Sequence, residues 1–126
     1  MTDILIVDDD ADLTQMLQEV LEIEGYSVAH APDGLAALAW LQQEHIPPRA
    51  LLIDISMPRM DGPTLIAHIE ALPAFATVPL LVMTAERRPA DYLRGLTIAG
   101  ILTKPFHLDT LLTHVSHVVM QTPLAA

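Results

Sequence analysis

ALLIDISMPRMDG, residues 50–62, places four apolar residues directly before a carboxylate and a turn that contains proline. An apolar run without polar alternation, such as Ala50–Ile53, is typical of a strand that is buried on both faces of a parallel sheet. Asp54 would then lie at the carboxyl end of that strand, where open α/β sheets bind ligands. A carboxylate at such a position needs a cap, a charged partner or a cation. Asp54 is therefore either a cap of the following turn or part of a binding site.

The length and composition indicate one globular domain over residues 1–126, with residues 122–126 as a loose tail. Hydrophobic residues make up 52% of the chain and charged residues 17%, which excludes a disordered protein. Cysteine is absent, no apolar run approaches the ~18 residues of a membrane span, and no signal peptide opens the chain, so a cytoplasmic location is expected. The net charge of −10 disfavours nucleic acid as a partner and suits a divalent cation or a basic protein surface.

Five apolar runs alternate with segments in which apolar residues recur every three or four positions. The first pattern predicts strands and the second predicts amphipathic helices, two of which Asp33 and Pro63 are placed to start. This alternation predicts an α/β fold, a doubly wound parallel sheet of five strands with five helices in three layers. The predicted strands are Ile4–Val7, Tyr26–Ala31, Ala50–Ile53, Val78–Met83 and Ile101–Thr103; the predicted helices are Asp12–Glu24, Leu35–Gln43, residues 63–72, Pro89–Leu96 and His107–Gln121.

Polar side chains end four of the predicted strands: Asp8 and Asp9 the first, Asp54 the third, Thr84 the fourth and Lys104 the fifth. The carboxyl ends of parallel strands share one edge of a sheet, so these side chains converge. Three carboxylates ~4–5 Å apart repel one another unless a cation joins them, and oxygen ligands without cysteine favour Mg²⁺. Asp9 would ligate the ion directly, and Asp8 directly or through a water. Asp54 would attack as a nucleophile to form an acyl phosphate, while Thr84 and Lys104 contact phosphoryl oxygens.

Short motifs occur in a fixed order along the chain: Ile4-Leu5-Ile6-Val7-Asp8-Asp9, Asp54, Met57-Pro58, Met60-Asp61-Gly62, Met83-Thr84-Ala85 and Lys104-Pro105-Phe106. Together they resemble the receiver domain of bacterial two-component response regulators, including the chemotaxis regulators, from Ile4 to about Val119. The resemblance implies a flavodoxin-like sheet of order 2-1-3-4-5 and a signalling domain rather than a conventional enzyme.

The same resemblance implies that Asp54 accepts a phosphoryl group from a sensor histidine kinase or a histidine phosphotransfer protein. Ser56 would lend its backbone carbonyl to Mg²⁺, and the Lys104–Pro105 peptide bond would be cis. Phosphorylation would draw in Thr84 and repack the face formed by the fourth helix, fifth strand and fifth helix, where a protein target reads the signal. No output domain is expected in this chain, so it would signal by protein contact or pass the phosphoryl group onward.

Three features depart from the family pattern. Ile101 stands three residues before the lysine, where the family usually has an aromatic residue, so an aromatic rotamer cannot report on Thr84. The interval from Thr84 to Lys104 is 104 − 84 = 20 positions, about two fewer than is usual in the family, which predicts a shortened or distorted fourth helix and loop. This region lacks the alternating charges that pair similar receivers, so a monomer or weak dimer is expected. The departures favour, as an alternative, an interaction module of receiver fold with weakened or lapsed phospho-switching.

Other residues carry weaker signals. A small phosphohydrolase would need a second acid near Asp54 to drive turnover, and the sequence offers only the metal-binding pair. Asp10 and Asp12 fit a cap and first-turn charge of the first helix better than a metal site. His107, His114 and His117 lie near one another on the last helix, but no carboxylate accompanies them, so a metal site there is disfavoured.

Overall fold

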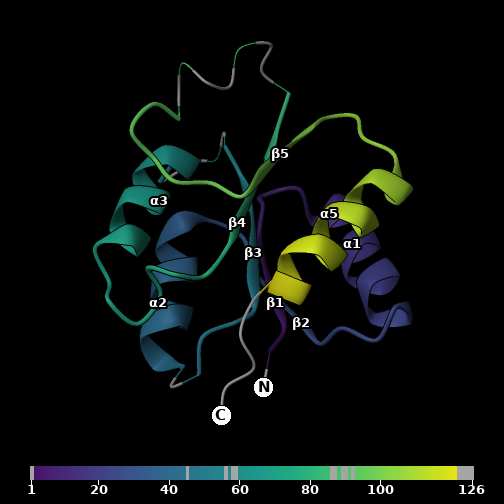
Figure 1. The fold of residues 1–126 in the computed structure, drawn as a ribbon, viewed down its shortest axis with the longest axis horizontal. Helices are drawn as coiled ribbons and strands as arrows, with labels where there is room; N and C mark the ends of the chain where they lie inside the picture. The colour runs from purple at the N-terminus through teal and green to yellow at the C-terminus, as the bar shows by residue number, and fades with distance from the viewer. Residues whose placement is uncertain are drawn as a thin grey trace.

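The computed structural model describes residues 2–44, 46–55, 57, 60–85, 88, 91 and 93–121. Five parallel strands form one sheet in the order β2-β1-β3-β4-β5, with helices on both of its faces (Figure 1). The strands are β1 (Ile4–Val7), β2 (Val28–Ala31), β3 (Ala50–Asp54), β4 (Leu80–Thr84) and β5 (Gly100–Thr103). The helices are α1 (Ala11–Ile23), α2 (Gly34–Gln43), α3 (Gly62–Glu70) and α5 (Leu108–Gln121). The predicted three-layer α/β fold and its 2-1-3-4-5 strand order are confirmed.

The core has two halves, one on each face of the sheet. Helices α2 and α3 lie on one side in Figure 1, and their Leu41 and Ile66 pack with Leu51 and Ile53 of β3. Helices α1 and α5 cover the other side, where Leu52 of β3 joins the second cluster. Because alternate residues of β3 enter opposite clusters, both faces of this strand require apolar side chains. The unbroken apolar run before Asp54 follows from this position at the centre of the sheet.

Aspartates begin three of the helices. The side chain of Asp10 accepts a hydrogen bond from Leu13 N at 3.1 Å, and that of Asp33 accepts one from Ala36 N at 2.8 Å. Both confirm the predicted caps. Asp61 caps α3 in the same way through Thr64 N at 2.8 Å, which the sequence prediction did not include. Each cap satisfies a helix N–H that has no partner within the helix.

Some predicted boundaries were wrong. Strand β2 begins at Val28 rather than Tyr26, because the N–H of Tyr26 still bonds to Leu21 O at the end of α1. Strand β4 begins at Leu80 rather than Val78, after a proline that has no N–H for the ladder.

The described residues contain four helices rather than the five that were predicted. Of the predicted helix Pro89–Leu96, residues 89, 90 and 92 lie outside the described residues. Residues 93–96 form a turn closed by Leu96 N to Leu93 O at 3.0 Å, and Gly95 adopts a φ of +82°. A positive φ ends a helix, so this end of the segment is not helical. None of the helices in the described part of the chain has the length and hydrophobicity of a membrane span.

Candidate functional site

The carboxyl edge of the sheet brings the predicted side chains together. Asp8 follows β1 directly, and the register pairs Val7 of β1 with Ile53 of β3, the residue before Asp54. Asp54 in turn pairs with Met83, and the next residue of β4, Thr84, pairs with Thr103 of β5. The four adjacent strands β1, β3, β4 and β5 therefore end close to the same level, and Lys104 follows β5.

Three carboxylates form the centre of the site. One ligand oxygen from each of Asp8, Asp9 and Asp54 lies within 4.8 Å of the others. Asp8 and Asp54 are buried, with exposed fractions of 2% and 7%, whereas Asp9 is exposed. A compact set of carboxylate oxygens that opens to solvent on one side fits a hard cation such as Mg²⁺, which binds few carboxylates and keeps several waters. These three residues are the donors that would hold it.

Lys104 supplies a positive charge to the same site. Its Nζ lies 3.0 Å from Asp8 Oδ2 and 3.5 Å from Asp54 Oδ2, and its side chain is 23% exposed. The backbone of this residue is tied to the end of β4, because Lys104 N donates to Thr84 O at 2.7 Å. The Lys104–Pro105 peptide bond is cis, as predicted. The ammonium therefore neutralises part of the charge of two nearly buried carboxylates.

Asp8 is held through both of its oxygens. Oδ2 contacts the ammonium of Lys104, while Oδ1 accepts a hydrogen bond from Asp10 N at 2.9 Å. The second bond comes from the residue that caps α1, so the start of this helix orients the acid pair. Asp10 itself is not part of the carboxylate cluster, in agreement with its predicted structural role.

Gly62 is a further residue of the site's framework that the sequence prediction did not single out. A Cβ added there would lie 2.6 Å from Ile55 Cα and 2.8 Å from Asp54 O. Gly62 N also donates to Ile55 O at 2.9 Å. Helix α3 thus begins in backbone contact with the end of β3, which requires glycine. The Asp61-Gly62 pair in the sequence was the available signal.

The remaining predicted residues have different outcomes. Thr84 is fully buried at the end of β4. Ser56 lies outside the described residues, so its predicted carbonyl ligand stays a prediction. Ile101 is half-buried and packs against the cluster between the sheet and helices α2 and α3. Within the described part of the chain, the one group of three or more potential metal ligands is Asp8, Asp9 and Asp54, so the histidines of α5 form no such group.

Comparison with known proteins gives one consistent family. Residues 4–116 match the model of the response regulator receiver domain. The chain is 41% identical over 105 residues to an uncharacterized 14.6 kDa protein from Leptolyngbya boryana, covering 82% of this chain and 79% of that protein. It is 31% identical to a transcriptional regulatory protein, the CpxR homolog of Haemophilus influenzae, over 97% of this chain and 52% of that protein. The chain thus spans about half the length of the larger regulators that it matches.

Solved structures agree with the fold. The receiver domain of a signal transduction histidine kinase from Syntrophus aciditrophicus superposes with a TM-score of 0.89 at 26% identity, covering 100% of this chain and 96% of that one. The chemotaxis response regulator CheY4 of Vibrio cholerae superposes with a TM-score of 0.85 at 31% identity, covering 94% of this chain and 98% of that one. The fold and the order of the strands are therefore those of a known architecture.

Proposed function

Because the chain belongs to the family of response regulator receiver domains, we propose that Asp54 accepts a phosphoryl group from a phosphohistidine in a reaction that depends on Mg²⁺. Receiver domains of response regulators act in two-component signalling and pair with histidine kinases. The observation that carries the proposal is the joint position of three clustered carboxylates and the Lys104 ammonium, 3.5 Å from Asp54 Oδ2.

The proposed reaction moves one phosphoryl group. A carboxylate oxygen of Asp54 forms a bond to phosphorus while the bond between phosphorus and the imidazole nitrogen of the donor breaks. The electron pair of the broken bond stays on the imidazole, and the product on this chain is an acyl phosphate. Negative charge is spread over the three equatorial oxygens during transfer, so positioning and neutralisation supply most of the catalysis.

The chain's own residues divide this work. Asp8 and Asp9, with Asp54 and the backbone carbonyl of Ser56, would hold Mg²⁺, which when bound neutralises charge on the phosphoryl oxygens. Lys104 would pair with one phosphoryl oxygen, and the Thr84 hydroxyl would donate to another. Lys104 Nζ already lies 3.5 Å from Asp54 Oδ2, so a small shift of the ammonium would bring it into contact with a phosphoryl group on Asp54.

The direct test is incubation with acetyl phosphate and MgCl₂, followed by intact mass measurement. The wild type should gain one phosphate, and the gain should require Mg²⁺. Asp54→Asn should remove it, whereas Asp12→Asn, which neutralises an exposed carboxylate in the first turn of α1, should leave it unchanged. Persistent labelling of Asp54→Asn would contradict the assignment of the acceptor.

A second candidate is an interaction module of receiver fold whose phospho-switching has weakened. It is favoured by Ile101, whose aliphatic side chain packs against the core on β5 beside the proposed output face of β5 and α5. In this case wild type and Asp54→Ala should bind a protein target with equal affinity, with and without acetyl phosphate. A large gain in affinity upon phosphorylation would exclude this candidate.

A further inference from the structure

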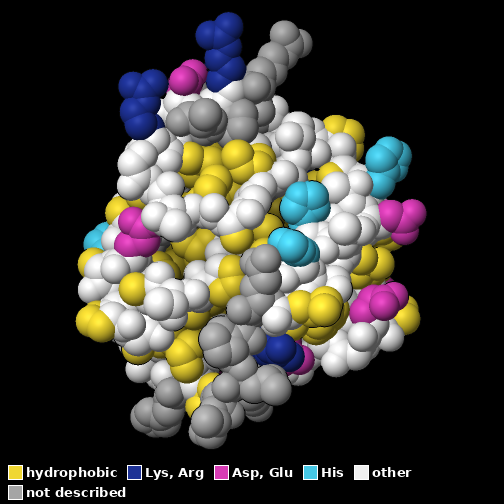
Figure 2. Space-filling model, viewed as in Figure 1, with side chains coloured by type: hydrophobic (Ala, Val, Ile, Leu, Met, Phe, Trp, Pro, Cys, Tyr) yellow, Lys and Arg dark blue, Asp and Glu magenta, His cyan; other side chains and the backbone are white. Residues whose placement is uncertain are grey.

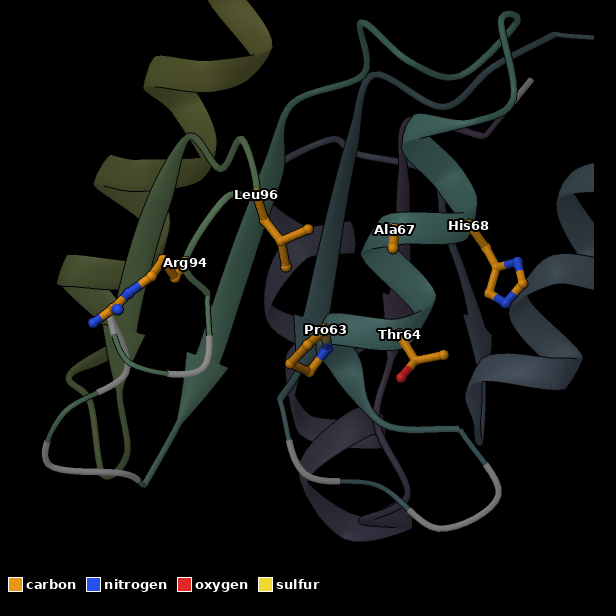
Figure 3. Close-up of a pocket in the computed structure, with 6 residues that line it drawn as sticks. All are labelled: Pro63, Thr64, Ala67, His68, Arg94 and Leu96. Atoms are coloured by element: carbon orange, nitrogen blue, oxygen red, sulfur yellow. The ribbon is translucent and has the colours of Figure 1, made fainter.

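A groove separates α3 from the chain that leads into β5. It has a volume of about 530 Å³. Its lining includes none of the proposed phosphorylation residues. The residues that line it are Pro63, Thr64, Ala67 and His68 of α3, with Arg94 and Leu96 opposite (Figure 3).

The groove has an apolar floor between two basic side chains. In Figure 3, Leu96 extends into the gap toward α3, where Pro63 and Ala67 stand opposite it. Arg94 projects outward on one side and His68 on the other. The Arg94 side chain is 85% exposed, and its ion pair with Asp91 is long, at 3.9 Å, and itself exposed. Such a pair contributes little, so the guanidinium remains available to a partner.

A second cavity lies beyond the groove at the C-terminal end of α3. Its volume is about 360 Å³, and its lining includes Ile69 and Glu70 of α3 and the stretch from Thr97 to Ala99. Thr97 N donates to Glu70 Oε1 at 2.8 Å, which holds this stretch beside the helix. Nine helical residues span ~14 Å. A surface of this shape suits an extended or helical segment better than a compact small molecule.

Local charge sets the chemistry of the occupant. The segment between β4 and β5 contains three of the six basic residues of the chain, Arg87, Arg88 and Arg94, and two acidic residues, Glu86 and Asp91. It is therefore slightly basic in a sequence whose net charge is −10. Figure 2 shows Lys or Arg side chains gathered at this edge of the molecule, with hydrophobic side chains exposed beside them. Most of the remaining surface therefore repels an acidic partner, while this edge attracts one.

We propose that the groove between α3 and residues 94–99 docks an acidic amphipathic helix of a partner protein. Its apolar stripe would cover Leu96, Ala67 and Pro63. Acidic residues on either side of the stripe would pair with Arg94 and accept a hydrogen bond from the imidazole of His68. This is the helix-in-groove mode of recognition, in which residues at i, i+3, i+4 and i+7 provide the anchors. The proposal stands independently of phosphorylation at Asp54.

The test uses a synthetic 16-residue peptide with leucines at i, i+3, i+4 and i+7 and glutamates on both flanks of that stripe. Added to ¹⁵N-labelled protein, it should shift the amide signals of α3 and residues 93–99. Arg94→Glu and Ala67→Glu, both on exposed positions, should weaken the affinity about fivefold or more. Arg88→Glu makes the same charge change on the same segment without lining the groove, and should weaken it less. Circular dichroism confirms that each variant is folded.

Three results would overturn the proposal. The first is no shift of amide signals at millimolar peptide, and the second is shifts confined to another face of the protein. The third is equal affinity for the same peptide with lysine in place of glutamate. Sedimentation velocity tests whether a second copy of this chain occupies the groove instead. Self-association of the wild type that Arg94→Glu removes would assign the groove to a second copy of this chain instead of an acidic partner.

Discussion

Replacing Lys104 by methionine should destabilise the protein when divalent cations are absent. The ammonium lies 3.0 Å from Asp8 Oδ2 and 3.5 Å from Asp54 Oδ2, and both carboxylates are nearly buried. At an effective dielectric constant near 20, each contact corresponds to about 5 kcal/mol of Coulomb energy. Dehydration offsets much of this, and removing one partner of a buried pair costs about 3 kcal/mol net. Methionine retains most of the apolar stem, so the loss reports on the charge.

Magnesium should reduce this deficit. In the wild type, bound Mg²⁺ would neutralise the same carboxylates as the ammonium, and the two cations would repel each other. In Lys104→Met the ion would have no competitor. Mg²⁺ should therefore raise the stability of the variant more than that of the wild type, since the stabilisation by a ligand grows with the logarithm of its affinity for the folded state.

The assay is urea and thermal unfolding, followed by circular dichroism, in EDTA and in saturating MgCl₂. A loss of about 3 kcal/mol corresponds to about 12 °C in melting temperature for a chain of this size. Arg94→Met is the matched control, because that side chain is 85% exposed and its ion pair is long; it should change stability by less than about 0.5 kcal/mol. The reasoning would be refuted if Lys104→Met and wild type were equally stable in EDTA. It would also be refuted if Mg²⁺ raised the stability of both proteins by the same amount.

Other variants test the framework of the site by urea unfolding. Thr14→Val should stabilise the protein by about 1 kcal/mol, because the buried hydroxyl has no hydrogen-bond partner among the described residues. A loss of stability would indicate that this hydroxyl does have a partner. Gly62→Ala should cost about 2 kcal/mol or more, since its Cβ would approach Ile55 Cα to 2.6 Å; a neutral result would mean that α3 can shift away. Asp33→Ala should cost about 1 kcal/mol through loss of the α2 cap, and Asp33→Asn much less; equal losses would exclude the cap as the cause.

The sequence predicted the central strands well because each is buried on both faces. Strand β1 was predicted with its observed bounds, and β3 differs by the added Asp54. The errors fall at Tyr26 and Val78, where apolar residues continue beyond the ladder. Periodicity reports burial rather than hydrogen bonding, so it cannot separate a strand residue from an apolar residue in the adjoining turn. The same reasoning explains the segment before Leu96, where the turn depends on the backbone angle of Gly95.

The candidate site was predictable to the extent that it follows from strand order. Once the strands are parallel, Asp8, Asp54 and Lys104 must share an edge, and the structure brings them together there. The contact of Gly62 with the backbone at the end of β3 was not predictable in this way. The same holds for the hydrogen bond that Thr97 N donates to Glu70 Oε1. Both depend on the path of a loop in space, which apolar patterning does not encode.

The route from the proposed acceptor to the groove is constrained by where the chain between β4 and β5 is tied. At one end, Lys104 N bonds to Thr84 O at 2.7 Å; at the other, Ala99 N bonds to Leu80 O at 2.8 Å. If both bonds persist, we expect a displacement that starts at Thr84 to be taken up between them, in the stretch that includes Arg94. If phosphorylation at Asp54 moves that stretch, it changes the affinity of the groove for its partner, and the bound partner must change the free energy of phosphorylation by the same amount. Such a route would run through the backbone before β5, so it would not require an aromatic side chain at the position of Ile101.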